Sequence, residues 1–127
     1  MDGLATPPES ASHHATQQSN HIYLWMSDYH PDGAQLFWPE RPIPFVVTLG
    51  LNTKGDEIVP SDMQSFYIPA GLGVYLHPGT WHNGIYVHQD HTPARFLTRQ
   101  GRVHARVSVS WADEFGSLLR VPLKLGN

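Results

Sequence analysis

Proline and glycine interrupt this chain so regularly that a long unbroken helix has no room to form. The 127 residues include eleven prolines and eleven glycines, and the stretches between them are short. The apolar or alternating stretches are HIYLWM, AQLFW, PFVVTLGL, SFYIPAGLG, GVYLHP, GIYVH, RFLTRQ, RVHARVSVSW and LLRVPL. Short runs rich in β-branched and aromatic residues and bounded by turn residues are typical of strands. The pattern therefore predicts an all-β protein with antiparallel strands.

Helical periodicity is nearly absent. No window of a dozen residues keeps apolar side chains at i, i+3, i+4 and i+7 without an internal proline or glycine, and ADEFGSLL is long enough for one turn at most. The clearest strand runs from Val103 to Trp111, where alternation puts His104, Arg106, Ser108 and Ser110 on the face opposite the apolar side chains. The apolar face is expected to pack in the core, and the polar face to meet bulk solvent or the water of a cavity.

The length corresponds to one ordinary domain. Residues 1–20 are polar, rich in proline, serine and glutamine, and without periodicity. Such a segment buries too little apolar surface to offset its conformational entropy, so we expect a disordered N-terminal tail. Residues 21–127 are expected to form a single β-domain. His13 and His14 lie in the tail and are expected to be solvated.

Composition and charge exclude several classes of function. The chain has no cysteine, so it has no disulfide framework and no thiol nucleophile, and a reducing compartment is expected. A formal net charge of −3 with eight dispersed Lys and Arg residues offers no basic stripe for nucleic acid. No apolar run approaches the roughly 20 residues needed to span a bilayer, and the N-terminus has no signal-peptide pattern. We therefore expect a cytoplasmic protein without nucleic-acid or membrane partners.

The candidate chemistry is concentrated in residues 73–83, GVYLHPGTWHN. A short strand would put Tyr75 and His77 on the same side, and the Pro-Gly turn that follows would return His82 towards the sheet. Histidine titrates near neutrality, so either imidazole is suited to general base catalysis. We predict His82, His77 and Tyr75 as catalytic residues, with a purely structural role as the competing interpretation.

A second block, YHPDGAQLFWPERPIPFVVTLGL, precedes this segment and supplies His30, Gln35 and a valine-rich strand. GVYLHPGTWHN resembles the second cupin motif. Together, in this order and spacing, the two blocks are similar to those of the ureidoglycolate lyase family, small cupins of purine catabolism and allantoin degradation. The resemblance covers residues 28–83 and, more loosely, RVHARVSVSW. It implies a cupin-type double-stranded β-helix, a small antiparallel β-barrel of the jelly-roll type, and a homodimer.

The resemblance also implies a reaction. A lyase of this type cleaves the carbon–nitrogen bond of an α-hydroxy acid: a base removes the hydroxyl proton, a carbonyl forms, and urea leaves after protonation, with no organic cofactor. The substrate is expected to be small, polar and carboxylate-bearing, and Arg106 is a candidate cation for that carboxylate. The predicted substrate-binding residues are Gln35, His30, Trp81, His104 and Arg106.

The chain departs from the family's pattern in several places. Asn83-Gly84 stands where the family often has a second histidine followed by proline, the N-terminal part is shortened, and the HxH and glutamate of the first cupin motif are missing. A divalent metal, Zn, Ni or Fe, could still be held by His30, His77 and His82. The acidic residues, among them Asp28, lie in turn-like stretches and form no carboxylate pair. A diverged lyase or isomerase on the same scaffold remains open.

Two other interpretations belong to different functional classes. A non-catalytic ligand-binding or regulatory cupin would use the same His, Trp and Tyr side chains to hold a metabolite without converting it. A dimerisation module would exchange HIYLWM between subunits as an edge strand. Whether the histidines share a cavity or are scattered over the outer surface distinguishes these interpretations.

Overall fold

Antiparallel strands make up most of the computed structural model of this protein, which describes residues 15–18, 20–31, 34–53, 56–83, 85–100 and 107–123. Within these ranges the helical segments are α1 (Trp111–Phe115) and two 3-10 turns, Pro60–Asp62 and Gln89–His91. The all-β class predicted from the sequence is confirmed, and the first four residues of ADEFGSLL lie in the short helix α1, while its last residue begins β11 (Leu119–Pro122).

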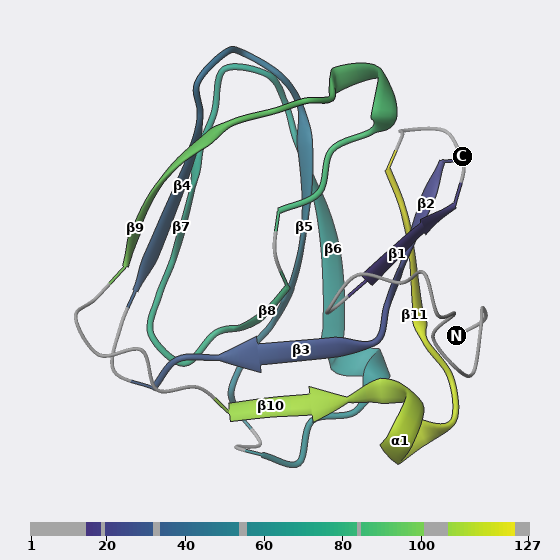
Figure 1. Cartoon of the computed structure of the whole chain (residues 1–127). Coiled ribbons are helices and arrows are strands. Elements are labelled where there is room, and N and C mark those ends of the chain that lie inside the picture. The colour runs from purple at the N-terminus through teal and green to yellow at the C-terminus, as the bar shows by residue number, and fades with distance from the viewer. Residues whose placement is uncertain are drawn as a thin grey trace.

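The strands form three sheets, and the five-stranded sheet lies between the two three-stranded ones (Figure 1). Sheet A has the order β1-β2-β11 and contains Ala15–Gln18, His21–Leu24 and Leu119–Pro122. Sheet B has the order β10-β3-β8-β5-β6 and contains Val107–Ser110, Met26–Tyr29, Trp81–His82, Phe45–Gly50 and Met63–Ile68. Sheet C has the order β7-β4-β9 and contains Val74–Leu76, Gln35–Pro39 and Phe96–Gln100. Over the described residues the layers are consistent with a cupin-like β-sandwich and do not join into a closed barrel.

Part of the segment expected to be a disordered tail forms a strand. Ala15–Gln18 pairs with His21–Leu24, whose other edge pairs with Leu119–Pro122. Backbone hydrogen bonds to β2 thus supply the order that the polar side chains of this segment do not indicate. HIYLWM is divided at Trp25 between β2 and β3, and each part has a neighbouring strand on both sides, so it is not the edge strand that an exchange between subunits would need. Residues 1–14, with His13 and His14, lie outside the described residues.

The main core lies between sheet A and one face of sheet B. It gathers buried apolar side chains from both ends of the chain: Ile22, Leu24, Val46, Ile58, Trp81, Val109, Trp111, Leu119, Val121 and Leu123. The central strand β5 is buried along nearly its whole length because β8 and β6 flank it and its two faces both pack. Burial on both faces explains why FVVTLG is almost continuously apolar instead of alternating.

The strand predicted from Val103 to Trp111 is observed in part. Val109 and Trp111 are buried and Ser108 is exposed, as the alternation predicts. Trp111 nevertheless begins α1 instead of ending the strand, because the Ser110 hydroxyl accepts a hydrogen bond from the Asp113 N–H (3.3 Å) and caps the helix. Residues 101–106, and with them His104 and Arg106, lie outside the described residues.

A buried hydrogen-bond network joins sheet B to α1. The Ser27 hydroxyl donates to Asn83 Oδ1 (2.6 Å) and accepts from Trp111 Nε1–H (3.0 Å), while the Asn83 amide donates to the Met26 carbonyl. Ser27, Asn83 and Trp111 are all buried. The network therefore fixes the backbone immediately after His82 to the core.

Removing the central hydroxyl of this network is expected to destabilise the fold. Ser27→Ala would leave Asn83 Oδ1 and the Trp111 N–H buried without their partner, and an unsatisfied buried polar group costs about 1–3 kcal/mol. We expect the free energy of unfolding, measured by urea denaturation, to fall by about 2 kcal/mol. Ser61→Ala, which removes an exposed hydroxyl, should change it by less than about 0.5 kcal/mol. Equal losses in the two variants would contradict the role of the network.

Candidate active site

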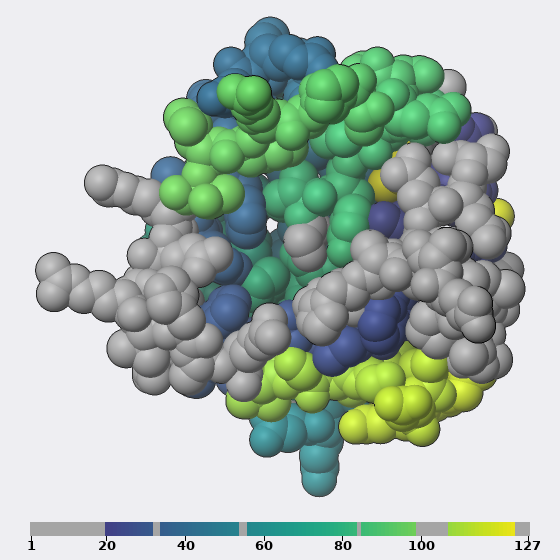
Figure 2. Space-filling view, viewed as in Figure 1, coloured from purple at the N-terminus to yellow at the C-terminus, as the bar shows by residue number. Residues whose placement is uncertain are grey.

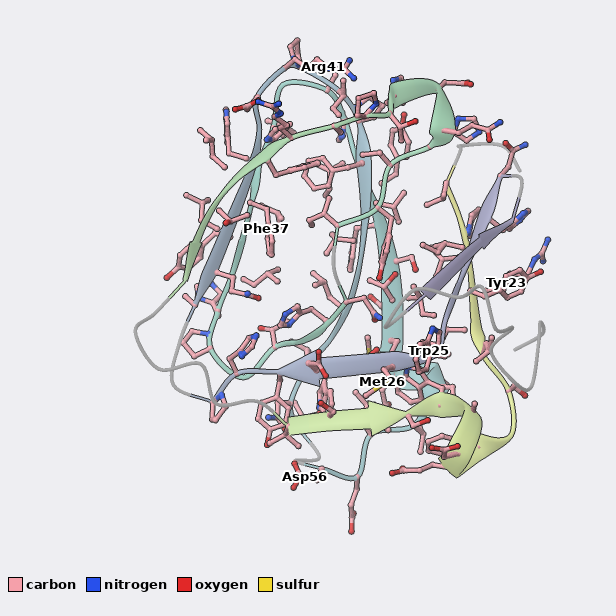
Figure 3. All side chains as sticks on the ribbon, in the orientation of Figure 1. Tyr23, Trp25, Met26, Phe37, Arg41 and Asp56 are labelled. Atoms are coloured by element: carbon pink, nitrogen blue, oxygen red, sulfur yellow. The ribbon has the colours of Figure 1, made fainter. Side chains whose placement is uncertain are left out.

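Sheets B and C face each other on the side of sheet B that is turned away from the main core. Phe45 of β5 and Phe96 of β9 meet edge to face with ring centroids 5.2 Å apart, which identifies the inner face of each sheet. Register and alternation put Phe37 and Gln35 of β4 on the same face as Phe96, and Phe37 points from β4 towards β5 (Figure 3). The surface is hollowed beside β4 and β9 (Figure 2). Residues on these inner faces are therefore in position to contact a small molecule.

His82 ends β8 on the inner face of sheet B. Its register partners are Leu49 of β5 and Asp28 of β3, and only 8% of the residue is exposed. The ring Nδ1 lies 2.9 Å from the Thr80 carbonyl oxygen. A carbonyl only accepts, so Nδ1 carries the hydrogen and donates it, which leaves the Nε2 lone pair as the acceptor of the ring.

The surroundings of His82 favour its neutral form. Burial lowers the pKa of His82 below its ordinary value. Smaller influences follow in decreasing order: the Thr80 carbonyl raises this pKa, His30 lowers it, and Asp28 raises it. A neutral imidazole with an available Nε2 has the protonation state that a general base needs at neutral pH.

His30 stands beside His82, with ring centroids 5.3 Å apart and planes tilted by 41°. A backbone contact holds the two segments together, because the Gly79 N–H donates to the His30 carbonyl at 2.9 Å. Gly79 has φ +81°, a conformation that residues with a Cβ rarely adopt. The turn before His82 therefore packs against the segment that carries His30. We call His30 and His82 the histidine pair.

Gln35 begins β4 and is buried on the inner face of sheet C, where 6% of it is exposed. Its Oε1 has no hydrogen-bond partner among the described residues. A buried carbonyl oxygen without a donor costs free energy, and native proteins contain few of them. An N–H group of a bound ligand would satisfy this oxygen.

A cavity of about 460 Å³ lies where β5 and β6 of sheet B approach β7 of sheet C. Its lining includes Leu49 and Leu76, which are the register partners of His82 and Gln35. Its size is within the range of small-molecule sites. Gln35 and His82 do not line the cavity themselves, and each is related to it through its register partner on the neighbouring strand.

Tyr75 and His77 also line this cavity, with their ring centroids 5.3 Å apart. The alternation of the strand predicts that these two rings share a side, and they do. Both residues are exposed, whereas His82 is buried and is not one of the lining residues of this cavity. Thr80, which accepts the hydrogen bond from His82, forms part of the lining. The structure thus divides the predicted catalytic residues into an exposed pair at the cavity and a buried imidazole next to it.

Trp81 does not reach the site, although we predicted it to bind substrate. It is 1% exposed, belongs to the main core and packs edge to face against Tyr29 with ring centroids 4.7 Å apart. Consecutive strand residues point to opposite faces, so Trp81 and His82 are on different sides of sheet B. Its role is in packing.

The three histidines predicted as metal ligands do not converge. His30 and His82 are paired, but His77 contacts Tyr75 at the cavity. Within the described ranges no group of three His, Asp or Glu side chains is placed to hold a metal ion, and ligand atoms must lie about 2 Å from a common ion. These residues do not fit a metal centre, and we derive no step through a metal.

Asp28 is a neighbour of the histidine pair that the sequence pattern did not predict. The local sequence is turn-like, but Asp28 lies in β3 opposite His82. Its Oδ1 accepts a hydrogen bond from the Ser108 hydroxyl at 2.5 Å. Asp28 and His30 are two residues apart, and in a strand such residues share a face. This spacing could have predicted that Asp28 lies near the histidine pair.

Comparison with known protein families supports the resemblance of the two sequence blocks. The family model described as ureidoglycolate lyase matches residues 7–114. A comparison with individual curated proteins found no match. Among the helices of the described residues, none has the length and apolar character required to cross a membrane.

Proposed function

Because this chain belongs to the ureidoglycolate lyase family, we propose that it cleaves the carbon–nitrogen bond of ureidoglycolate and releases glyoxylate and urea. The observation that carries this proposal is the buried His82, whose Nδ1 is held by the Thr80 carbonyl so that Nε2 is available as a base. The proposal assigns the base role to His82 in preference to His77.

The protein's part in this reaction begins with the substrate hydroxyl. His82 Nε2 accepts the hydroxyl proton, the oxygen electron pair forms the carbonyl of glyoxylate, and the electrons of the carbon–nitrogen bond leave with the urea nitrogen. That nitrogen takes up a proton from solvent, which completes urea, and His82 returns its proton to solvent. The base is ready at neutral pH because burial lowers the pKa of His82. A positioned general base contributes about 10²–10⁴-fold to such a step.

Gln35 supports the choice of a ureido substrate. A ureido group carries several N–H donors, and Gln35 Oε1 is a buried acceptor that has no partner among the described residues. A ureido N–H that donates to Gln35 Oε1 would give this buried oxygen a hydrogen-bond partner. The Gln35 amide would therefore increase the affinity for the substrate and also orient it. Tyr75 and His77, at the exposed side of the cavity, are proposed to contact the substrate without acting as its base.

The substrate carboxylate is proposed to meet His104 and Arg106. The alternation of the sequence predicts the same face for these two residues as for Ser108. Ser108 donates a hydrogen bond to Asp28, the register partner of His82, so that face carries the histidine pair. His104 and Arg106 lie outside the described residues, and their role stays a prediction.

An assay of all products tests the proposed reaction. Purified protein is incubated with ureidoglycolate, and glyoxylate, urea and ammonia are quantified separately. We expect urea and glyoxylate in equal amounts without ammonia, since the ureido group leaves intact. Ammonia in place of urea would indicate hydrolysis of the ureido group. Binding of substrate without turnover would contradict the lyase and favour the non-catalytic ligand-binding alternative.

We also propose that the protein acts as a homodimer in the cytoplasm. The outer face of sheet C supports the dimer, because Trp38 and Leu97 are register partners there. These two apolar side chains are 46 and 59% exposed. A stable interface buries about 800 Å² per partner around an apolar centre, which these side chains would form. The absence of cysteine agrees with the proposed compartment.

A charge on this outer face is expected to separate the subunits. Leu97→Glu would bury carboxylates in the apolar centre of the interface, which is costly. We expect wild type to sediment as a dimer and Leu97→Glu as a folded monomer in sedimentation velocity runs at equal concentration. Leu51→Glu alters a residue that is 75% exposed in the segment after β5 and should leave the dimer intact. A monomeric wild type, or a dimeric Leu97→Glu protein, would contradict this interface.

A further inference from the structure

We infer that Gly79 is a positioning residue for substrate binding, because its left-handed backbone conformation holds His30 beside His82. The inference rests on the proposed function, with His30 as one of the substrate-binding residues predicted from the sequence. Gly79 lies in the turn between β7 and β8. It has no side chain, so its effect on the histidine pair must come from its backbone.

The turn is formed by residues 77–80, and the Thr80 N–H closes it by donating to the His77 carbonyl at 3.3 Å. Its second residue is Pro78, whose ring fixes φ at about −65°. Its third residue is Gly79, whose φ is +81°. A negative φ followed by a positive one is the conformation of a type II turn, in which the third residue is usually glycine or asparagine.

The turn type determines the direction of the Gly79 N–H. A type I turn differs from a type II turn by about 150° in ψ of its second residue and by about 170° in φ of its third, so the peptide group between them is rotated by about half a turn. In the observed turn the Gly79 N–H donates to the His30 carbonyl at 2.9 Å. In a type I turn the Pro78 carbonyl would take that direction, and two carbonyl groups cannot form a hydrogen bond with each other.

His30 lies just beyond the end of β3, where this hydrogen bond extends a short pairing. The pairing of β3 with β8 has one register pair, Asp28 with His82, and β8 is two residues long. When this antiparallel register is continued beyond β8, His30 comes to lie opposite Thr80. The bond from Gly79 therefore holds the His30 backbone at the place where its ring centroid is 5.3 Å from that of His82.

The space around Gly79 does not require a glycine. An added Cβ would meet Asn52 Nδ2 at 3.7 Å and Asn52 Cβ at 4.0 Å, and these are ordinary van der Waals contacts. Asparagine is larger than alanine but adopts the left-handed conformation more readily. If conformation is decisive, Gly79→Asn should therefore resemble wild type more closely than Gly79→Ala does. If packing is decisive, the order should be reversed.

Proton NMR of the full chain without ligand tests the geometry. In wild type we expect cross-relaxation between the carbon-bound ring hydrogens of His30 and His82, and slow exchange of the hydrogen-bonded Gly79 amide. Gly79→Ala should lose the cross-relaxation, and Gly79→Asn should keep it.

Gly71→Ala is the matched control for these variants. Gly71 also has a positive φ (+94°), and an added Cβ would meet nothing among the described residues within 4 Å. It lies in the connection between β6 and β7. Gly71→Ala thus introduces the same kind of backbone strain outside the turn that contacts His30, and it should keep the cross-relaxation of wild type.

Titration calorimetry with N-carbamoylglycine, which has the ureido and carboxylate groups of ureidoglycolate, provides the second readout. We expect the dissociation constant to rise about tenfold in Gly79→Ala, as for one lost hydrogen bond to the ligand. In Gly79→Asn and Gly71→Ala it should stay within about threefold of wild type. Gly79→Ala should add no further loss to His30→Ala, because the glycine acts through that side chain.

The NMR result does not depend on the identity of the substrate, so a failure of the proposed function is distinguishable from a failure of this inference. Gly79→Asn affected as strongly as Gly79→Ala, or the same loss of cross-relaxation in Gly71→Ala, would overturn the inference. Rapid exchange of the Gly79 amide in wild type would overturn it as well, and that measurement is decisive even if Gly79→Ala does not fold.

Discussion

His82→Asn is expected to lower kcat for ureidoglycolate cleavage by about 10³-fold, because a general base contributes roughly 10²–10⁴-fold. The substitution suits the site. The asparagine amide can still donate to the Thr80 carbonyl that now receives the His82 Nδ1 hydrogen, but it has no basic nitrogen. Circular dichroism and urea denaturation should show a folded protein, so the loss can be assigned to chemistry. The measurement is the initial rate of urea release at saturating substrate.

The matched control for this variant is His77→Asn. His77 is exposed and contacts Tyr75 at the cavity, so its loss should change kcat no more than several-fold, within the range of a lost binding contact. If His77→Asn lost as much activity as His82→Asn, or if His82→Asn kept wild-type kcat, the chemistry would lie on the exposed side of the cavity and the assignment of the base would be wrong.

The pH dependence of the wild type provides a second test of the same residue. Burial lowers the pKa of His82, so the acid limb of kcat/KM should have its midpoint below the ordinary histidine value of about 6.5. The same lowered pKa makes stability depend on pH. In the unfolded chain His82 takes up a proton as the pH falls through about 6.5, whereas in the folded protein it does so only at lower pH. His82 therefore stabilises the fold above that value, and this contribution is lost as the pH falls below it. The decrease in free energy of unfolding between pH 7.5 and 5.5 should be smaller in His82→Asn.

Gln35→Leu is expected to change stability and ligand affinity in opposite directions. Leucine removes a buried oxygen that has no donor among the described residues, so the free energy of unfolding should stay constant or rise by about 1 kcal/mol. The dissociation constant of N-carbamoylglycine should rise about tenfold or more through the lost hydrogen bond. This compound has the ureido and carboxylate groups but no hydroxyl, and therefore cannot be cleaved. Urea denaturation and titration calorimetry provide the two values.

Two controls separate a binding role of Gln35 from a structural one. Gln64→Leu alters an exposed glutamine that lines the cavity, as Gln35 does not, and it should change the dissociation constant less than threefold, well below the effect of a lost buried hydrogen bond. N-acetylglycine has no terminal ureido amino group and should not discriminate between wild type and Gln35→Leu. A Gln35→Leu protein that is clearly less stable and binds N-carbamoylglycine as wild type does would show that the glutamine serves the fold.

The local sequence could predict those features that depend on neighbouring residues. The strand class follows from turn residues and alternation, and the two blocks pointed to His30, Gln35 and His82, which the fold brings to facing sides of sheets B and C. The register between strands could not be predicted in this way, because it depends on residues that are far apart in the sequence. The local sequence around Asp28 is typical of a turn. Its place in β3 becomes evident only from the pairing of β3 with β8 and with β10, whose Ser108 is 80 residues away in the chain.

The same limit explains the errors around His82. The motif puts Trp81 and His82 side by side, but only the pairing of β8 with β5 and β3 determines that His82 faces sheet C and Trp81 faces the core. It also clarifies the departure at Asn83. The Asn83 side chain forms hydrogen bonds with Ser27 and with the Met26 carbonyl within the core. The residue that stands in place of the family's second histidine therefore has a structural role and does not replace a member of the histidine pair.

A crystal structure of the protein with bound N-carbamoylglycine would show whether the substrate lies between Gln35 and His82. We expect the ureido group within hydrogen-bond distance of Gln35 Oε1, about 2.7–3.2 Å. The carbon that bears the hydroxyl in the true substrate is expected to face His82 Nε2. An analogue bound only near Tyr75 and His77, or outside the space between sheets B and C, would contradict this expectation.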